Sequence, residues 1–289
     1  MTLHPMTLHP VLDDPAVTFT LVEVPRGPLA ALRRDPAGER RETVLLVPGY
    51  TGSKEDFRLL LAPLSEAGHP VVALDQRGQF QSPGPDALEA YDVEALAEDL
   101  LAVVDALDDG PVHLVGHSFG GLVARAAALR RPEAFASLVL MSSGPAGLTG
   151  PRVVVVGLMR PLLEQGMPAL VEVMDQLNAA DARFLALDAS VQDFLRDRML
   201  ASSAQGLLGM ADGLTGEPDR VDALRETGLP VLVLHGEHDD AWSPELQAEM
   251  ARRLDAEHRV IADAVHSPAV EQPEATAAAL LEFLRTARR

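Results

Sequence analysis

Apolar runs alternate along the chain with segments whose apolar positions recur at helical spacing. The apolar runs cover residues 43–49, 70–75, 111–117, 136–143 and 229–236. They lack polar alternation, which is typical of parallel strands covered on both faces. Between them, residues 54–68, 92–109 and 119–131 show the spacing of amphipathic helices. The alternation predicts an α/β protein with a mostly parallel, doubly wound sheet.

The regular alternation is interrupted once. From about residue 144 to residue 228 the pattern is helical, with few strand-like runs. Before it, residues 17–24 alternate with period two, as expected for an edge strand; after it, residues 258–264 form a last strand and a final helix follows. We therefore expect an α/β core made of residues 1–144 and 228–289, with a helical cap over residues 145–227.

Composition limits the partners that this fold could have. The chain carries 24 basic and 43 acidic residues, a net charge of −19, which disfavours nucleic acids and anionic membranes. It has no cysteine, so disulfides and thiolate metal sites are excluded. We expect a monomer or a homodimer.

Nothing in the sequence predicts export or membrane insertion. The segment MTLHPMTLHPVLDDPAV lacks the basic and apolar regions of a secretory signal, and the apolar run 153–159 is too short to span a bilayer. A cytoplasmic location is the prediction. The repeat of MTLHP at Met1 and Met6 is interpreted as a misassigned start or a cloning remnant.

The most informative stretch is Gly116-His117-Ser118-Phe119-Gly120, which matches G-x-S-x-G between an apolar strand and a helix. A turn this tight strains the serine backbone and needs small residues two positions away on either side. The strain would aim the Ser118 hydroxyl above the sheet as a nucleophile. The same pattern also arises by chance, and only its strand–turn–helix context favours the catalytic interpretation.

A serine nucleophile needs a base and an acid that orients it. Asp239 and His266 each follow a predicted strand, in the order Ser, Asp, His, so all three would meet at the carboxyl edge of the sheet. Asp240 is the alternative acid. His117 is interpreted as structural because neighbours around a sharp turn point apart. His235 and His238, together with the two aspartates, resemble a metal cluster only weakly, and we predict no metal site.

The oxyanion formed during acyl transfer needs two backbone N–H donors. Phe119, directly after the nucleophile, would supply one. The other would come from the loop that follows strand 43–49, where Pro48-Gly49-Tyr50-Thr51-Gly52 lets the backbone curl back, and we assign it to Tyr50.

Four blocks together resemble the α/β-hydrolase superfamily, in the branch of serine hydrolases and esterases with a helical cap: LLVPGYTGSKEDF, VVALDQRGQFQSPGP, LVGHSFGGLVARAAALRRPEAFASLVLMSS, and LPVLVLHGEHDDAWSP with VIADAVHSPAVEQPE. The resemblance implies the α/β-hydrolase fold with the cap inserted after the sixth strand. It also implies Ser118 as nucleophile, Asp239 as acid, His266 as base, and Tyr50 and Phe119 as oxyanion donors. Asp75 and Arg77 match a loop of this family that usually braces the active-site wall and does not react. Pro48-Gly49 departs from the usual His-Gly.

These observations predict a serine hydrolase that cleaves small to medium apolar carboxylic esters without a cofactor or metal. Met159, Leu163, Met174 and Met210 of the cap and Trp242 are the predicted pocket residues, since methionine-rich walls adapt to apolar groups. Thioester, lactone or C–C bond hydrolysis, or perhydrolysis, would use the same triad. A ligand-binding module on a hydrolase scaffold is the non-enzymatic alternative.

Overall fold

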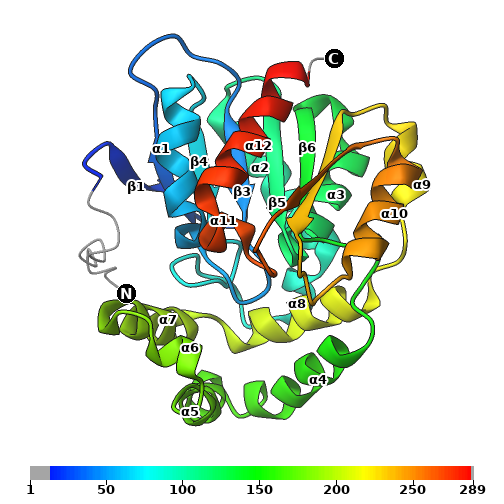
Figure 1. Cartoon of the computed structure of the whole chain (residues 1–289). Helices are drawn as coiled ribbons and strands as arrows, with labels where there is room; N and C mark the ends of the chain where they lie inside the picture. Colours follow the sequence, from blue (N-terminus) through cyan, green and yellow to red (C-terminus); the bar gives the residue numbers. More distant parts are fainter. Residues whose placement is uncertain (1–13, 288–289) are drawn as a thin grey trace.

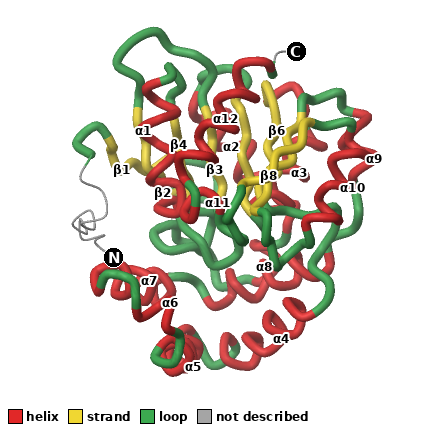
Figure 2. The backbone as a smooth tube through the Cα atoms, viewed as in Figure 1, coloured by secondary structure: helices red, strands yellow, loops and turns green. Residues whose placement is uncertain are grey.

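An eight-stranded sheet crosses the molecule in the order β1-β2-β4-β3-β5-β6-β7-β8 (Figures 1 and 2). The computed structural model describes residues 14–287. The strands are β1 Val17–Val22, β2 Leu29–Arg34, β3 Val44–Val47, β4 Val71–Leu74, β5 Val112–His117, β6 Phe135–Met141, β7 Val231–Gly236 and β8 Glu257–Ile261. The pairs from β4 through β8 are parallel, whereas β2 is antiparallel to both β1 and β4. The predicted mostly parallel sheet is confirmed.

Strand β2 was not predicted from the sequence. Its residues, LAALRR, show no period-two alternation, and leucine, alanine and arginine are strong helix formers. The segment is nevertheless a strand, because it pairs with β1 on one side and β4 on the other, and Leu29 to Leu32 are completely buried. Tertiary pairing here overrides local propensity.

Helices cover both faces of the sheet (Figure 1). Short 3₁₀ segments are η1 Lys54–Phe57, η2 Leu88–Tyr91 and η3 Pro132–Ala134. The helices of the core are α1 Arg58–Glu66, α2 Val93–Leu107, α3 Phe119–Arg130, α9 Val221–Glu226, α10 Pro244–Leu254, α11 Pro268–Glu271 and α12 Pro273–Thr286. The remaining helices, between β6 and β7, are α4 Pro151–Leu163, α5 Met167–Asn178, α6 Ala182–Leu185, α7 Ala189–Ala201 and α8 Ala204–Gly216.

The sheet separates two hydrophobic layers. Successive residues of β3 illustrate this, since Leu45 packs in the layer that contains α2, α3 and α10, whereas Leu46 packs in the layer that contains α1 and α12. All four residues of β3 are buried. A strand that is apolar at every position can be buried only in this way, which is why the absence of polar alternation predicted helices on both faces.

The helical insertion follows β6, the sixth strand, as expected for the α/β-hydrolase fold. Its helices α4 to α7 lie across one end of the sheet, with α8 between α4 and the core (Figure 1). Helix α9, inside the predicted cap range 145–227, packs on the core through Val221 and Leu224. The division into residues 1–144, 145–227 and 228–289 stays a prediction.

Two predictions about the ends and the environment are only partly addressed by the fold. The repeated MTLHP segment lies outside the described residues. Across residues 14–287, every helix is too short or too polar to cross a bilayer. The compartment and the oligomeric state stay predictions.

Candidate active site

Ser118 lies at the junction between β5 and α3, in the backbone conformation that the motif predicted. Its φ is 54° and its ψ is −121°, a region that non-glycine residues rarely adopt. Hydrogen bonds hold the turn on both sides: the Ser118 N–H donates to Met141 O at 2.9 Å, and the Gly121 N–H donates to Ser118 O at 2.9 Å. The strain is therefore maintained by the surrounding backbone, which presents the hydroxyl at the carboxyl edge of the sheet.

The glycines of the motif allow backbone segments to approach each other closely. A Cβ on Gly120 would lie 2.4 Å from Pro48 O and 2.5 Å from Val47 O, and one on Gly116 would lie 2.4 Å from Gly120 O. These neighbours are main-chain atoms that cannot rotate away. Packing of β3 against the turn thus requires glycine at position 120, and packing of β5 against the start of α3 requires it at position 116.

We expect Gly120→Ala to lower the free energy of unfolding by about 3 kcal/mol, because overpacking forces the β3 backbone away from the turn. The matched control is Gly157→Ala in α4, where an added Cβ meets nothing within 4 Å. In that variant the free energy of unfolding should rise by about 0.5–1 kcal/mol, because alanine favours the helix more than glycine does. Urea denaturation of both variants measures the difference, and an unchanged midpoint for Gly120→Ala would contradict the packing argument.

The three residues predicted as a triad are linked by hydrogen bonds, in the order Ser118, His266, Asp239. His266 Nε2 lies 3.0 Å from Ser118 Oγ, and His266 Nδ1 lies 3.0 Å from Asp239 Oδ1. Asp239 follows β7 and His266 follows β8, so the carboxyl ends of three parallel strands bring the groups together. The arrangement lets the imidazole accept the serine proton while the carboxylate holds its other nitrogen protonated.

Asp239 is built to stay ionised. Besides His266, the backbone N–H of Ala241 donates to Oδ1 at 3.0 Å, and the Gln247 amide donates to Oδ2 at 3.0 Å. Burial by itself would raise the pKa of Asp239. The hydrogen bonds from His266, Ala241 and Gln247, together with the electrostatic attraction of the His266 imidazole, lower this pKa below its usual value. The acid is therefore a carboxylate at neutral pH.

Two side chains, those of His117 and Glu271, anchor the backbone that carries His266. From the sequence, His117 was predicted to be structural, and Glu271 had no predicted role. His117 Nε2 donates to the carbonyl oxygen of His266 at 2.8 Å. The carboxylate of Glu271 accepts from the N–H of Val265 and, at 3.2 Å, from the N–H of Ser267, one on each side of His266. His117 and Glu271 are thus positioning residues for the imidazole. Glu271 lies within the block VIADAVHSPAVEQPE, but nothing in the sequence indicated that its carboxylate bonds to the backbone on both sides of His266.

His117 remains neutral in this environment. Burial, and in second place the neighbouring His266, lowers the pKa of His117 to about 4. A neutral imidazole with its proton on Nε2 can donate to the His266 carbonyl without placing a second charge beside the triad. The structural interpretation of His117 is consistent with this contact.

Of the two predicted oxyanion donors, Phe119 directly follows Ser118, and Tyr50 lines the same cavity as Ser118. Phe119 is the first residue of α3, so its N–H has no acceptor within the helix. Tyr50 follows Gly49, whose carbonyl accepts from the Gln79 amide at 2.6 Å. In a trans peptide the N–H points opposite to the carbonyl, so this bond turns the Tyr50 N–H away from Gln79. Gln79 was not identified from the sequence.

Replacing Gln79 by methionine is expected to reduce kcat for ester hydrolysis about 10- to 100-fold with KM nearly unchanged, since the Gly49–Tyr50 peptide loses the group that orients it. Gln81→Met is the control in the same loop, because Gln81 accepts from Lys54 at 2.7 Å instead of contacting the oxyanion loop. Steady-state kinetics compare the two variants. A rise in KM alone for Gln79→Met would show that the residue does not act on the oxyanion donor.

Ser118, His117 and His266 open into a cavity of about 890 Å³ beneath the cap. Its walls are mostly apolar and come from the cap, with charged groups at Asp56, Arg152, Arg198 and Glu271. Asp56 and Arg198 pair with each other at 2.6 Å, which joins α7 of the cap to η1 of the core. The apolar cap residues that line the cavity are Leu148, Val155, Val156, Leu158, Met159, Leu162, Leu170, Val173, Met174, Leu177, Leu195 and Leu214.

The predicted pocket residues separate into two groups. Met159 and Met174 line this cavity. Leu163, Met210 and Trp242 do not, and this part of the prediction is corrected: Leu163 and Met210 are buried in the packing between cap and core. Trp242 packs against Gly144, donates from its indole to Ala146 O at 3.0 Å, and stacks at an angle 6.4 Å from the His266 ring, behind the cavity wall.

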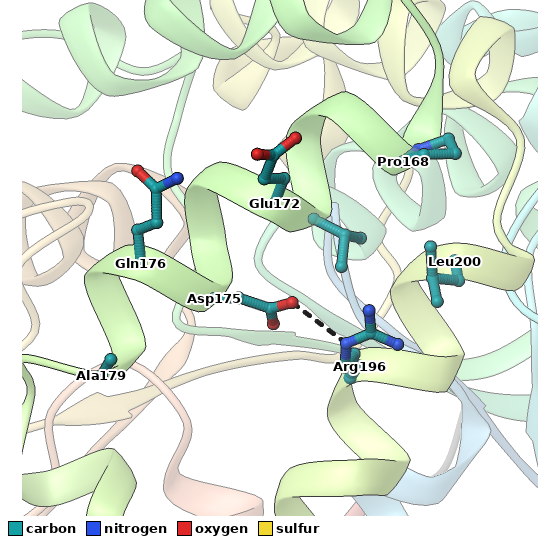
Figure 3. A pocket seen from close by; sticks show the side chains of 8 residues that line it. Pro168, Glu172, Asp175, Gln176, Ala179, Arg196 and Leu200 are labelled. Atoms are coloured by element: carbon teal, nitrogen blue, oxygen red, sulfur yellow. Dashed lines mark hydrogen bonds and ion pairs between the residues drawn. The ribbon is translucent and has the colours of Figure 1, made fainter.

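A second cavity of about 450 Å³ lies within the cap, between α5 and α7, and is unrelated to the triad. Figure 3 shows Asp175 of α5 reaching toward Arg196 of α7, with their charged groups 3.0 Å apart. Its lining includes no nucleophile or histidine. It belongs to the packing of the cap helices.

The alternative assignments can be compared with the geometry. Asp240 is exposed and pairs with Arg152, whereas Asp239 contacts the imidazole. His235 Nε2 lies 2.9 Å from His258 Nε2, and His238 is exposed beside Glu237. These two histidines therefore do not join Asp239 and Asp240 in the cluster that the sequence weakly suggested.

Another serine and histidine are in contact: His113 Nδ1 lies 2.8 Å from Ser137 Oγ. Both side chains are completely buried, and neither lines the cavity beneath the cap. Within residues 14–287 the nearest carboxylate to His113 is that of Glu42, 4.0 Å away. A substrate cannot reach this pair, so it is not a second catalytic centre.

Comparisons with known proteins agree with the fold. The model of the alpha/beta hydrolase family matches residues 44–279. The chain is 31% identical over 275 residues to polyketide synthase ThaQ of Burkholderia thailandensis, covering 93% of this chain but spanning only 13% of that protein. It is 28% identical over 255 residues to pimeloyl-[acyl-carrier protein] methyl ester esterase of Neisseria meningitidis, covering 83% and 92% of the two chains. A solved structure of a thermophilic esterase from Thermogutta terrifontis superposes with a TM-score of 0.75 at 26% identity, covering 94% of this chain and 100% of that one.

Proposed function

Because this chain belongs to the alpha/beta hydrolase family, we propose that it is a serine hydrolase that cleaves apolar carboxylic esters of small to medium size. The observation that carries the proposal is the chain of hydrogen bonds from Ser118 through His266 to Asp239, beside an apolar cavity. The esterase relatives described above support the same reaction class.

In the proposed reaction, Ser118 Oγ attacks the ester carbonyl carbon while its proton passes to His266 Nε2. The carbonyl oxygen becomes an oxyanion between the N–H groups of Tyr50 and Phe119. Collapse of the tetrahedral intermediate breaks the bond to the alkoxy oxygen, which takes the proton from His266 and leaves as the alcohol. Water then attacks the acyl-enzyme by the same route, and the carboxylic acid is released. Neither a metal nor a cofactor is required.

The shape and polarity of the cavity support an apolar substrate. Val155, Leu158 and Leu177 both line it and are exposed to solvent by 53, 67 and 66%. They therefore form an apolar rim at its opening. A volume of about 890 Å³ lies within the range of small-molecule sites. Since Asp56 and Arg198 neutralise each other, the site offers little attraction to a strongly charged substrate.

The experiment that tests the proposal is a series of p-nitrophenyl esters from acetate to laurate, with an acyl thioester and a lactone assayed in parallel. We expect turnover of the esters by the wild type and an optimum at an intermediate acyl length. If the wild type hydrolyses none of the esters but turns over the thioester or the lactone, the carboxylesterase proposal is wrong and that reaction takes its place. Binding without turnover of any compound would favour the ligand-binding alternative.

Narrowing the cavity should shift the chain-length preference. In Met159→Trp, kcat/KM for the longest esters is expected to fall at least tenfold relative to acetate, because chain segments that no longer fit lose their burial. Val154→Trp on the same helix is the control, since Val154 is 62% exposed and does not line the cavity. An unchanged preference in Met159→Trp would show that the acyl chain lies elsewhere.

A further inference from the structure

A second cluster of chemically active side chains lies at the opposite edge of the sheet from Ser118. Glu42 precedes β3, His69 precedes β4, and His113 is the second residue of β5. These strands are parallel neighbours, so their amino ends meet at one edge. In Figure 1 this edge lies at the end of the molecule where α12 finishes, away from the cap. The cluster is therefore separate from the proposed active site.

Both imidazoles are held through Nδ1, which leaves Nε2 available. His69 Nδ1 donates to the backbone carbonyl of Glu42 at 2.7 Å, and His113 Nδ1 bonds to Ser137 Oγ at 2.8 Å. Metal-binding histidines in proteins are typically oriented by this kind of bond at the second ring nitrogen. The side chain of His113 is 1% exposed, and its Nε2 has no hydrogen-bond partner among the described residues. A buried polar atom of this kind calls for an explanation.

The third group is the Glu42 carboxylate. Its Oε2 lies 4.0 Å from His113 Nε2, and one ligand atom from each of the three side chains lies within 4.8 Å of the other two. In a tetrahedral zinc site, with bonds of about 2.0–2.1 Å, ligand atoms lie about 3.3 Å apart. The Glu42 side chain is 56% exposed, so a rotamer change can supply the remaining movement.

Two of the three residues face a cavity that opens to solvent, and His113 lies buried behind them. Glu42 and His69 line a cavity of about 440 Å³. An ion could enter through this cavity, and a water molecule bound to the ion would have room there. Its other charged lining residues are Glu39, Asp109, Arg40, Arg41 and Arg285. Arg40 pairs with Asp35 and Asp109, each at 3.5 Å, so part of its charge is neutralised.

We propose that Glu42, His69 and His113 form a binding site for a divalent transition metal ion of the zinc type. Two imidazole nitrogens and one carboxylate are ligands that suit Zn²⁺ and exclude Mg²⁺ or Ca²⁺ as the preferred ion. The ion would connect the amino ends of β3, β4 and β5, three central strands of the sheet. Its effect is therefore on the stability of the folded chain, and ester hydrolysis does not involve it.

The test is calorimetric titration and thermal unfolding of the tag-free protein with ZnCl₂ at pH 7.5, compared with MgCl₂. We expect one Zn²⁺ to bind in the wild type, and at 100 times the dissociation constant the Tm should rise by about 5 °C. Glu42→Gln and His69→Asn should each weaken binding at least tenfold and remove the Tm shift. Glu39→Gln, a carboxylate of the same cavity outside the cluster, is the matched control and should bind as the wild type does.

Ester hydrolysis and circular dichroism verify that each variant is folded. Equal Zn²⁺ binding by Glu42→Gln and Glu39→Gln would place the ion elsewhere, for example at Asp239, Asp240 and His266, where it would also inhibit hydrolysis. That result, or a wild type that binds no Zn²⁺, would overturn the proposal. Neither result would affect the proposed hydrolase function, which is measured without added metal.

Discussion

Ser118→Ala should lower kcat for p-nitrophenyl butyrate by about 10⁵- to 10⁶-fold, leaving only what the oxyanion donors and binding provide. The reason is that in the proposed reaction Ser118 Oγ is the nucleophile, and His266 Nε2, 3.0 Å away, takes its proton. Because the methyl group of alanine retains the Cβ, the strained turn has no new contact to accommodate. The variant should therefore fold like the wild type, as thermal unfolding would show.

The matched control is Ser137→Ala, which removes a second serine that contacts a histidine among the described residues. Since Ser137 is completely buried and away from the cavity, hydrolysis by this variant should stay within about threefold of the wild type. The opposite pattern, with activity lost in Ser137→Ala and kept in Ser118→Ala, would move the catalytic centre to the buried pair. Retained activity in both variants would remove serine chemistry from the mechanism.

Asp239→Asn should lower kcat by about 10⁴-fold with little change in KM. An asparagine in this position no longer enforces the tautomer of His266 that carries its proton on Nδ1, and it cannot stabilise the imidazolium formed when Ser118 attacks. Asp240→Asn is the control: this neighbour is exposed and pairs with Arg152, so its loss should change kcat less than threefold. Similar losses in both variants would show that the acid is not specifically Asp239.

The pH profile gives an independent test of the same carboxylate. In the folded protein the pKa of Asp239 lies below its ordinary value of 3.8. A carboxyl with a depressed pKa contributes stability above its unfolded pKa and loses that contribution as the pH falls through the folded value. Protonation of Asp239 should therefore reduce neither stability nor activity above about pH 4. An inactivation step assigned to this residue near pH 6 would contradict the hydrogen-bond geometry.

Not every element of the fold was predictable from the sequence. Strands β3 to β7 were, because a strand that helices cover on both faces is mostly apolar and lacks polar alternation. Strand β2 was not, because LAALRR favours a helix by local propensity and becomes a strand only between β1 and β4. The backbone groups of β2 find their hydrogen-bond partners in β1 and β4. A short stretch of sequence around β2 does not include β4 and so cannot show this pairing.

The candidate site divides in the same way. The sequence by itself determined Ser118, Asp239 and His266, since each follows a parallel strand and such strands end at one edge of the sheet. Only the tertiary structure identified Gln79, whose amide bonds to Gly49 from thirty positions away, and Glu271, whose carboxylate folds back onto the N–H groups of Val265 and Ser267. It also separated Met159 and Met174, which line the cavity, from Leu163 and Met210, which pack against the core. Helical periodicity shows that a face is apolar, whereas the packing of the whole chain decides whether that face meets protein or an open cavity.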